Sequence, residues 1–217
     1  MGRTARPPRF EPPALGALLD GLAGDVGAGE TAEGLRFDGT DFSGRELGGA
    51  GFDECRLEGV AFDDAGLRGA RFTDCVVDGM QAATFRAPDS SWRRVDGARV
   101  RLGAAELFRA RFDEVRWLES RLGYLNLRGA RLVDVVFEDC RIDEVDLADA
   151  TATRVSLRGC RIDRLVVRGA KLADVDLRGA EIGAVDGVTS LGGAVVDELQ
   201  LVALSYAFAE ELGVRVG

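Results

Sequence analysis

Residues 127–150 read LRGARLVDVVFEDCRIDEVDLADA, and gaps of three and two residues alternate between their apolar or small side chains. These side chains fall at positions 127, 130, 132, 135, 137, 140, 142, 145, 147 and 150. An α-helix repeats its apolar face about every 3.6 residues, and a strand with one buried face repeats it every 2. A period of five fits neither element. The stretch therefore predicts one short strand and one corner in every five residues.

The same period continues along most of the chain. Every fifth residue from Phe37 to Gly187 gives 31 positions, which we call centres; 26 are large and apolar, and the other five are Ala or Gly. The residue two before each centre is small or apolar almost throughout, with Arg45 as the charged exception. The remaining three places carry nearly all the Asp, Glu and Arg. Two side chains of each five therefore point inward, and stacked coils are needed to bury a continuous core.

Glycine marks the corners of the repeat. It stands two residues after a centre ten times, and glycine there suits a turn that needs a positive φ. These glycines are residues 39, 44, 49, 59, 69, 79, 129, 159, 169 and 179.

Several fives resemble the A-(D/N)-L-x-x consensus of the pentapeptide-repeat family. Matching motifs are Ala130-Arg131-Leu132, Val145-Asp146-Leu147, Ala170-Lys171-Leu172 and Val175-Asp176-Leu177. The resemblance covers about residues 37–189, although Arg often replaces the Asp or Asn of the consensus. It implies an all-β fold, namely a right-handed quadrilateral parallel β-helix with four fives per coil and about eight coils.

The regions outside the repeat predict two caps. Prolines at 7, 8, 12 and 13 suggest a flexible tail over residues 1–12. Residues 13–34 are expected to cap the first coil, with a short helix formed around Leu15, Leu18, Leu19 and Leu22. The repeat itself occupies 35–189, and residues 190–217 form the C-terminal cap.

A C-terminal α-helix is predicted over residues 197–212. Asp197 is a suitable N-cap and Gly213 a suitable stop signal. The helix is more apolar than one core-facing stripe requires, so its surplus is expected to form a homodimer. The candidate dimer stripe consists of Leu201, Leu204, Phe208 and Leu212, widened by Leu199, Val202, Tyr206 and Ala209.

Composition argues against catalysis. The chain has no histidine, which removes histidine-based triads and most zinc and haem sites. GDVGAGE at 24–30 lacks the Lys-Ser/Thr of a phosphate-binding loop and indicates a cap instead. We expect a protein that is not an enzyme, with no catalytic residues, no cofactor and no metal.

The four cysteines leave two interpretations. Cys55 and Cys75 are separated by four fives, as are Cys140 and Cys160, so each pair is expected to stack on neighbouring coils. Disulfides or a metal site are one interpretation. The favoured one is small buried thiols at positions that elsewhere hold Ala and Val.

Charge and hydropathy narrow the class of partner. A net charge of −9 disfavours direct binding to nucleic acid or to an anionic membrane. No apolar run approaches the ~18 residues of a membrane helix, and the start lacks the apolar core of a signal peptide. A cytoplasmic protein that binds another protein is expected.

The outer face offers two unusual stretches and, drawn in part from them, a candidate partner surface. Residues 82–100 have small centres and Pro88, which indicates an irregular coil or a corner projecting towards a partner. Stacked Arg101, Arg121, Arg141 and Arg161 indicate an anion stripe or, as the favoured interpretation, local salt pairs with Glu119, Asp139, Asp143 and Asp163. The candidate partner surface comprises Asp63, Asp64, Arg86, Arg93, Arg94, Glu138, Asp139 and Glu144.

Two functions are carried forward. The first is a rigid, non-enzymatic protein-interaction scaffold whose partner is unassigned. The second is implied by the resemblance, because some acidic, dimeric members of the family imitate duplex DNA, bind DNA gyrase, and protect against fluoroquinolones or gyrase toxins. Residues 35–189 hold 28 acidic and 24 basic side chains, a net charge of −4. A duplex ~37 Å long carries about 22 charges, so the average charge favours the scaffold.

Overall fold

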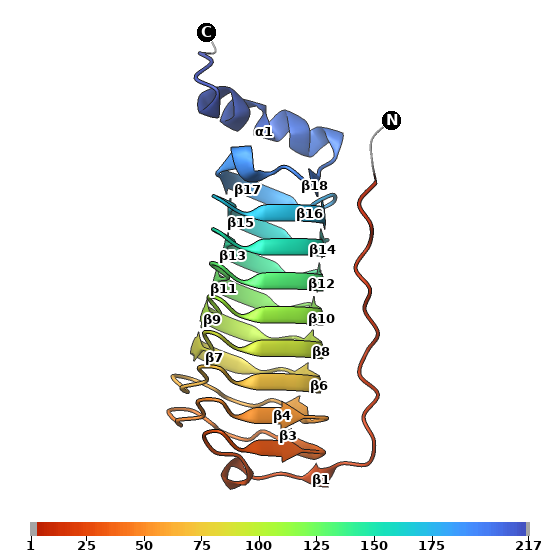
Figure 1. Ribbon diagram of the computed structural model, residues 1–217, viewed down its shortest axis with the longest axis vertical. Coiled ribbons are helices and arrows are strands. Elements are labelled where there is room, and N and C mark those ends of the chain that lie inside the picture. The colour runs from red at the N-terminus through yellow and green to blue at the C-terminus, as the bar shows by residue number, and fades with distance from the viewer. Residues whose placement is uncertain (1–3, 216–217) are drawn as a thin grey trace.

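The computed structural model describes residues 4–215, most of which coil into a parallel β-solenoid of about nine turns. The strands stack along one axis, and a single α-helix crosses the C-terminal end of the stack (Figure 1). The twelve-stranded sheet contains β1 (Leu19–Asp20), β2 (Thr31–Glu33), β3 (Leu35–Asp38), β4 (Gly51–Asp53), β5 (Arg56–Glu58), β6 (Arg71–Asp78), β8 (Ser91–Ala98), β10 (Arg111–Leu118), β12 (Arg131–Glu138), β14 (Thr151–Arg158), β16 (Lys171–Asp176) and β18 (Ala194–Val195). The six-stranded sheet contains β7 (Gln81–Arg86), β9 (Arg101–Glu106), β11 (Arg121–Asn126), β13 (Arg141–Asp146), β15 (Arg161–Val166) and β17 (Glu181–Asp186).

Each turn of the solenoid takes four fives. Leu132 of β12 pairs with Phe112 below it and Ala152 above it, and each partner is four fives away along the chain. This register holds from the pair Thr31–Gly51 to the pair Val166–Asp186. The predicted all-β solenoid is therefore confirmed, with about nine turns where about eight were predicted. The sheet already includes β1 at Leu19–Asp20, before the predicted start at residue 35. Its right hand and quadrilateral section stay predictions.

The centres form the core. Of the 31 centres, 28 are buried, and the other three, at 172, 182 and 187, lie half-buried in the last turns. Aromatic centres stack directly on one another, with Phe52 and Phe72 rings 5.0 Å apart and Phe72 and Trp92 rings 4.1 Å apart. Arg45, the charged exception, donates to the carbonyls of Ala23 and Val26 and so covers the first turn.

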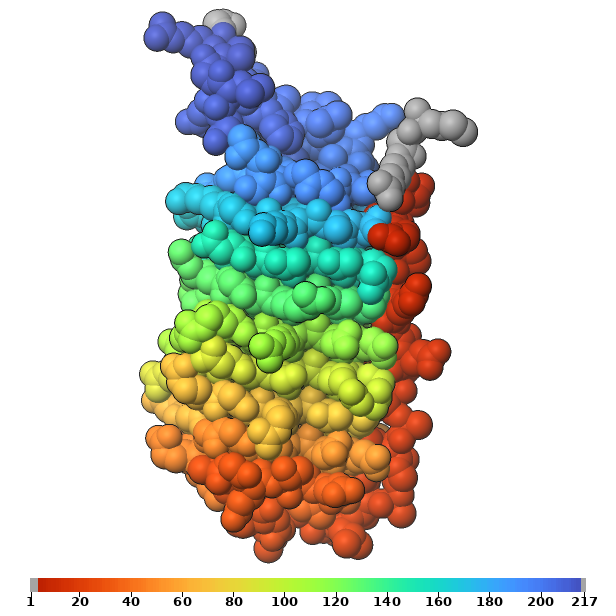
Figure 2. All heavy atoms as spheres, viewed as in Figure 1, coloured from red at the N-terminus to blue at the C-terminus, as the bar shows by residue number. Residues whose placement is uncertain are grey.

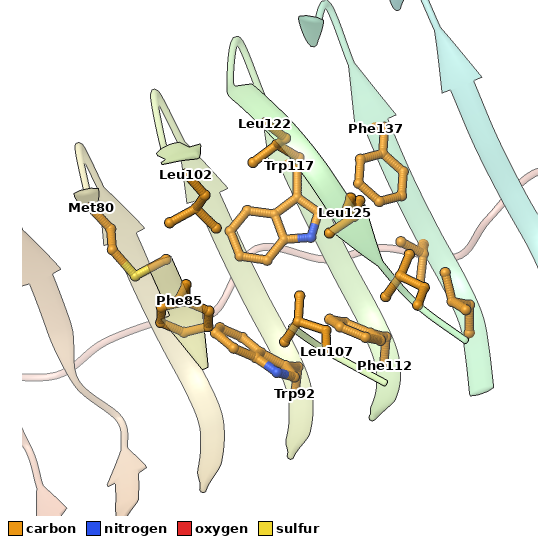
Figure 3. A pocket seen from close by; sticks show the side chains of 13 residues that line it. Met80, Phe85, Trp92, Leu102, Leu107, Phe112, Trp117, Leu122, Leu125 and Phe137 are labelled. Carbon is orange, nitrogen blue, oxygen red and sulfur yellow. The ribbon is translucent and has the colours of Figure 1, made fainter. Parts of the chain in front are cut away.

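The stretch 82–100 is regular, contrary to the prediction of an irregular coil or projecting corner. β7 and β8 keep the register of four fives with their neighbouring strands. Large side chains two places earlier, Met80 and Phe85, occupy the volume that the small centres Ala82 and Ala87 leave free. A Cβ on Gly97 would lie 2.4 Å from the Trp117 ring, so that ring fills the place of a side chain. Figure 3 shows Phe85, Trp92, Phe112 and Trp117 gathered in the same part of the core.

The corner glycines adopt the predicted conformation. All ten have a positive φ, and fourteen non-glycine residues share it, seven of them Asp. Asp tolerates this region better than most residues. One edge of the solenoid differs, because residues 84, 104, 124, 144, 164 and 184, all within the described chain, lack a positive φ. These residues lie in the six-stranded sheet, whose strands run straight through that corner.

The predicted N-terminal capping helix around Leu15, Leu18, Leu19 and Leu22 is wrong. Residues 13–18 have no helix, Leu19–Asp20 form β1 on β3, and only a 3-10 turn, Ala23–Asp25, follows. The segment 4–18, which we call the strap, instead runs extended along the side of the solenoid (Figures 1 and 2). Prolines oppose a helix, and they cost the strap no sheet hydrogen bond because it lies outside both sheets.

Specific contacts hold the strap against the solenoid, whereas a flexible tail was predicted over residues 1–12. The Arg9 N–H donates to Asp134 Oδ1 at 2.9 Å, and the Arg6 guanidinium binds Asp174 at 2.7 Å. The Arg116 guanidinium lies 5.0 Å from the centroid of the Phe10 ring. Residues 1–3 of the predicted tail lie outside the described residues.

Asp134 joins the strap to two turns of the solenoid. Its carboxylate accepts from Nε and Nη2 of Arg154 on the next turn, both at 2.6 Å, and from the strap. Burial alone would raise the pKa of Asp134, but the hydrogen bonds from Arg154 and from the Arg9 N–H outweigh it and hold that pKa below its usual value.

The predicted C-terminal helix is present as α1 (Glu198–Glu211). Asp197 accepts from the N–H of Gln200, and the Gln200 side chain accepts from the N–H of Asp197, which forms a capping box. The amide of Gln200 also donates to the carbonyls of Leu177 and Ala180 at 2.6 and 2.8 Å. These bonds attach the start of α1 to the last turns.

The cysteines follow the favoured interpretation. All four are free and buried. Burial raises the pKa of the Cys75 thiol, which keeps it in the neutral form.

Leu132→Asp should abolish folding, because a carboxylate would replace a side chain that is only 1% exposed in the middle of the stack. Circular dichroism should show no cooperative melt for this variant. Arg131→Asp, whose side chain is exposed one residue earlier, should melt close to wild type. A wild-type melt for Leu132→Asp would contradict the inward orientation of the centres.

Asp134→Asn should lower the free energy of unfolding at pH 7 by about 1–3 kcal/mol, because Arg154 and the strap lose a charged acceptor. Asp139→Asn is the matched control, since Asp139 has the same positive φ and forms no ion pair among the described residues. Because the pKa of Asp134 is lowered on folding, its contribution is complete above the unfolded value of about 3.9. It should disappear as the pH falls through the lowered pKa, which urea unfolding at pH 7 and pH 3 can check.

Candidate protein-interaction surfaces

The interior of the solenoid offers no room for a ligand. Its two internal voids, about 10 and about 20 Å³, are lined by apolar side chains such as Trp117 and Leu127. A single water needs roughly 10–15 Å³ and polar partners. Any binding site therefore belongs to the outer surface. Within residues 4–215, no helix is long and apolar enough to cross a membrane.

The first turns are strongly acidic. Residues 20–64, which we call the acidic end, hold twelve carboxylates and three arginines, so they carry a net charge of −9. Arg36 pairs with Asp20 and Arg56 with Glu58, while Arg45 binds backbone carbonyls. This segment spans about 11 Å of the axis at ~4.8 Å per turn. Duplex DNA carries about 6 charges over that length, so the acidic end exceeds it in net charge per unit length.

On the outer surface of the remaining turns, which we call the wall, many charges are balanced by ion pairs between neighbouring turns. Residues 65–217 hold 24 acidic and 22 basic side chains, a net charge of −2. Arg116 binds Asp96 through two hydrogen bonds of 2.8 Å, and Arg109 binds Asp89 through bonds of 2.7 and 2.9 Å. In both pairs the arginine lies one turn after the aspartate, directly above it.

Local salt pairing, the favoured interpretation of the arginine ladder, is mostly wrong. Arg161 pairs with Asp163 at 3.5 Å, as expected. Among the described residues, Arg101, Arg121 and Arg141 form no ion pair. These three arginines are therefore available to a partner.

The candidate partner surface does not form one patch. Asp63, Asp64 and Arg86 lie together, since Arg86 pairs with Asp64 at 2.8 Å and Asp63 accepts from the Thr84 N–H at 2.9 Å. The others lie elsewhere. Glu144 is on the same edge four turns further on, Arg93 and Arg94 are on a second edge where Arg94 binds Asp74, and Glu138 and Asp139 are on a third.

Helix α1 exposes a large apolar face. Leu199, Val202 and Tyr206 are 84%, 71% and 70% exposed, and they lie on one side of the helix. Leu204 and Phe208 of the predicted dimer stripe are half-buried, whereas Leu201 and Leu212 are exposed. The exposed face is therefore centred on Leu199, Val202 and Tyr206, which were predicted only to widen the dimer stripe.

A parallel solenoid built from repeats of five residues, with a filled interior, defines the class of protein to which this chain belongs. The family described as Pentapeptide repeats matches this chain with eight copies, over residues 36–74, 120–159 and 140–181. The chain belongs to the pentapeptide-repeat family.

Solved structures of two other proteins are similar to this chain. A trypsin-treated variant of QnrB1, a plasmid-mediated fluoroquinolone resistance protein, is 21% identical, with 88% of this chain and 91% of that chain covered and a TM-score of 0.43. HetL, a pentapeptide repeat protein involved in heterocyst differentiation regulation from the cyanobacterium Nostoc sp. strain PCC 7120, is 17% identical, with coverages of 79% and 91% and a TM-score of 0.35. The comparison with curated proteins found no match.

Proposed function

We propose that this protein is a rigid, non-enzymatic interaction scaffold that binds a protein partner through its outer wall. The observation that carries the proposal is the combination of a filled interior with an uneven exterior. One end of the rod is acidic, the wall is mostly neutralised, and the other end presents an apolar helix. A cytoplasmic location remains a prediction.

We further propose that α1 forms a homodimer. A helix that is more apolar than one core-facing stripe requires usually buries the surplus, yet α1 covers the last turns with only one of its sides. Exposed apolar patches of this kind usually mark association sites. A two-fold contact between two α1 helices would cover Leu199, Val202 and Tyr206 with the same residues of a second copy.

Modulation of DNA gyrase or another topoisomerase is the second candidate. The acidic end supports it, because its net charge per unit length reaches that of a duplex and exceeds it, while the average over the repeat is far lower. Any imitation of DNA would therefore use the acidic end rather than the length of the rod. The resemblance noted in the sequence supplies the identity of this candidate partner.

The dimer can be tested by light scattering. The wild-type chain should have a mass of about 46 kDa, twice its 23.2 kDa. Val202→Asp should give a folded monomer, because a carboxylate would be buried in the interface. The control Ala173→Asp, which adds the same charge on the exposed wall, should stay dimeric. A monomeric wild type would refute the dimer.

The gyrase candidate can be tested by supercoiling with purified gyrase. Inhibition, or protection from quinolone-induced cleavage, is expected at micromolar protein. The pair Glu30→Lys and Glu33→Lys should weaken it at least tenfold, because the change reverses charge at the acidic end. Asp113→Lys with Glu119→Lys makes the same charge change on the wall and should have little effect. Equal losses, or no effect of the wild type, would eliminate imitation of DNA by the acidic end.

A further inference from the structure

A shallow groove of about 510 Å³ crosses the six-stranded sheet from β7 to β11. We call it the arginine groove. Gln81, Arg101 and Arg121 line it at one position of successive turns, and Ala83, Gly103 and Gly123 form the adjacent floor. Asp63 and Asp143 close its two ends.

Backbone packing explains why the floor is bare. A Cβ on Gly103 would lie 2.5 Å from the Ala83 carbonyl oxygen, and a Cβ on Gly123 would lie 2.2 Å from the Gly103 oxygen. Side chains at these two positions would require the turns to move apart. The groove therefore lies where glycine stands at 103 and 123, and it ends where Asp143 carries a side chain at the same place in the turn.

The arginines beside this floor repel one another. Arg101 and Arg141 pair in register with Arg121 from either side, which puts neighbouring Cα atoms about 4.8 Å apart. Like charges at such positions destabilise a sheet. On other walls an aspartate lies below several arginines, as Asp96 lies below Arg116, but within residues 4–215 no carboxylate pairs with these three. A bound anion would supply the missing charge.

We propose that the arginine groove binds a short acidic segment of a protein partner. Each guanidinium presents five donors in a planar fork that matches a carboxylate, and Arg101 and Arg121 can each take one. Carboxylates two residues apart on an extended chain are ~6.6 Å apart, which two flexible arginines on adjacent turns can reach. A long polyanion fits poorly, because it would extend past Asp63 and Asp143 onto a protein of net charge −9.

This inference rests on the proposed scaffold function and specifies the chemistry of one partner. It does not depend on the dimer or on gyrase, because the groove is separate from α1 and from most of the acidic end. A second pair of arginines provides the internal control. Arg111 and Arg131 are also exposed, in register and without an ion pair among the described residues, but neither lines the arginine groove.

The test is fluorescence anisotropy with the full chain and a labelled nine-residue peptide that alternates Glu and Ser, in about 50 mM salt. Saturable binding in the micromolar range is expected, with at least tenfold weaker binding of the peptide that carries Gln in place of Glu. Arg101→Gln with Arg121→Gln should weaken binding at least tenfold. Ala83→Trp should do the same by filling the groove without a change in charge.

Arg111→Gln with Arg131→Gln should leave peptide binding within twofold of wild type, and all variants should keep the wild-type melt because the residues are exposed. No saturation up to about 1 mM peptide, or equal losses in the two arginine pairs, would overturn the groove assignment. Tighter binding of tripolyphosphate or of a single-stranded oligonucleotide would overturn the choice of an acidic protein segment. A dimer that persists in these cases would leave the scaffold proposal standing.

Discussion

In-register stacking is the constraint on which the whole molecule depends. Because each turn takes four fives, every side chain meets its counterpart directly above and below. Inside, this produces ladders of Phe and Trp rings and requires that a small centre such as Ala87 be matched by a large neighbour such as Phe85. Outside, it favours an aspartate below an arginine, as in Asp96 and Arg116, since identical charges in adjacent turns repel.

The sequence was sufficient for the features that repeat and insufficient for those that do not. Centres, corner glycines and α1 were predictable, because a period of five and a capping residue are local signals. The strap was not, since its bond from Arg9 to Asp134 joins residues far apart in the chain and leaves no periodic trace. The leucines at 15–22 suggested a helix, but neighbouring prolines and glycines leave that segment extended on the solenoid.

The candidate surfaces show the same division. The sequence predicts that Arg121 and Arg141 pair with acidic residues nearby in the chain. In the fold, most ion pairs join neighbouring turns instead, and among the described residues these two arginines have no carboxylate partner. The charge is also distributed unevenly along the rod, which an average over the repeat does not reveal. Residues 20–64 hold a net charge of −9, and residues 65–217 are close to neutral. A rod with separated charge can orient a partner before contact is made.

The strap changes how the stack can come apart. A solenoid linked only between neighbours can fray from either terminus one repeat at a time. Here a single extended segment begins beside β1 at one end and reaches Asp174 in β16 near the other. The last turns therefore cannot peel away without also releasing this tether. A mechanical load applied along the axis would be shared between the ladder of strands and a covalent chain running parallel to it.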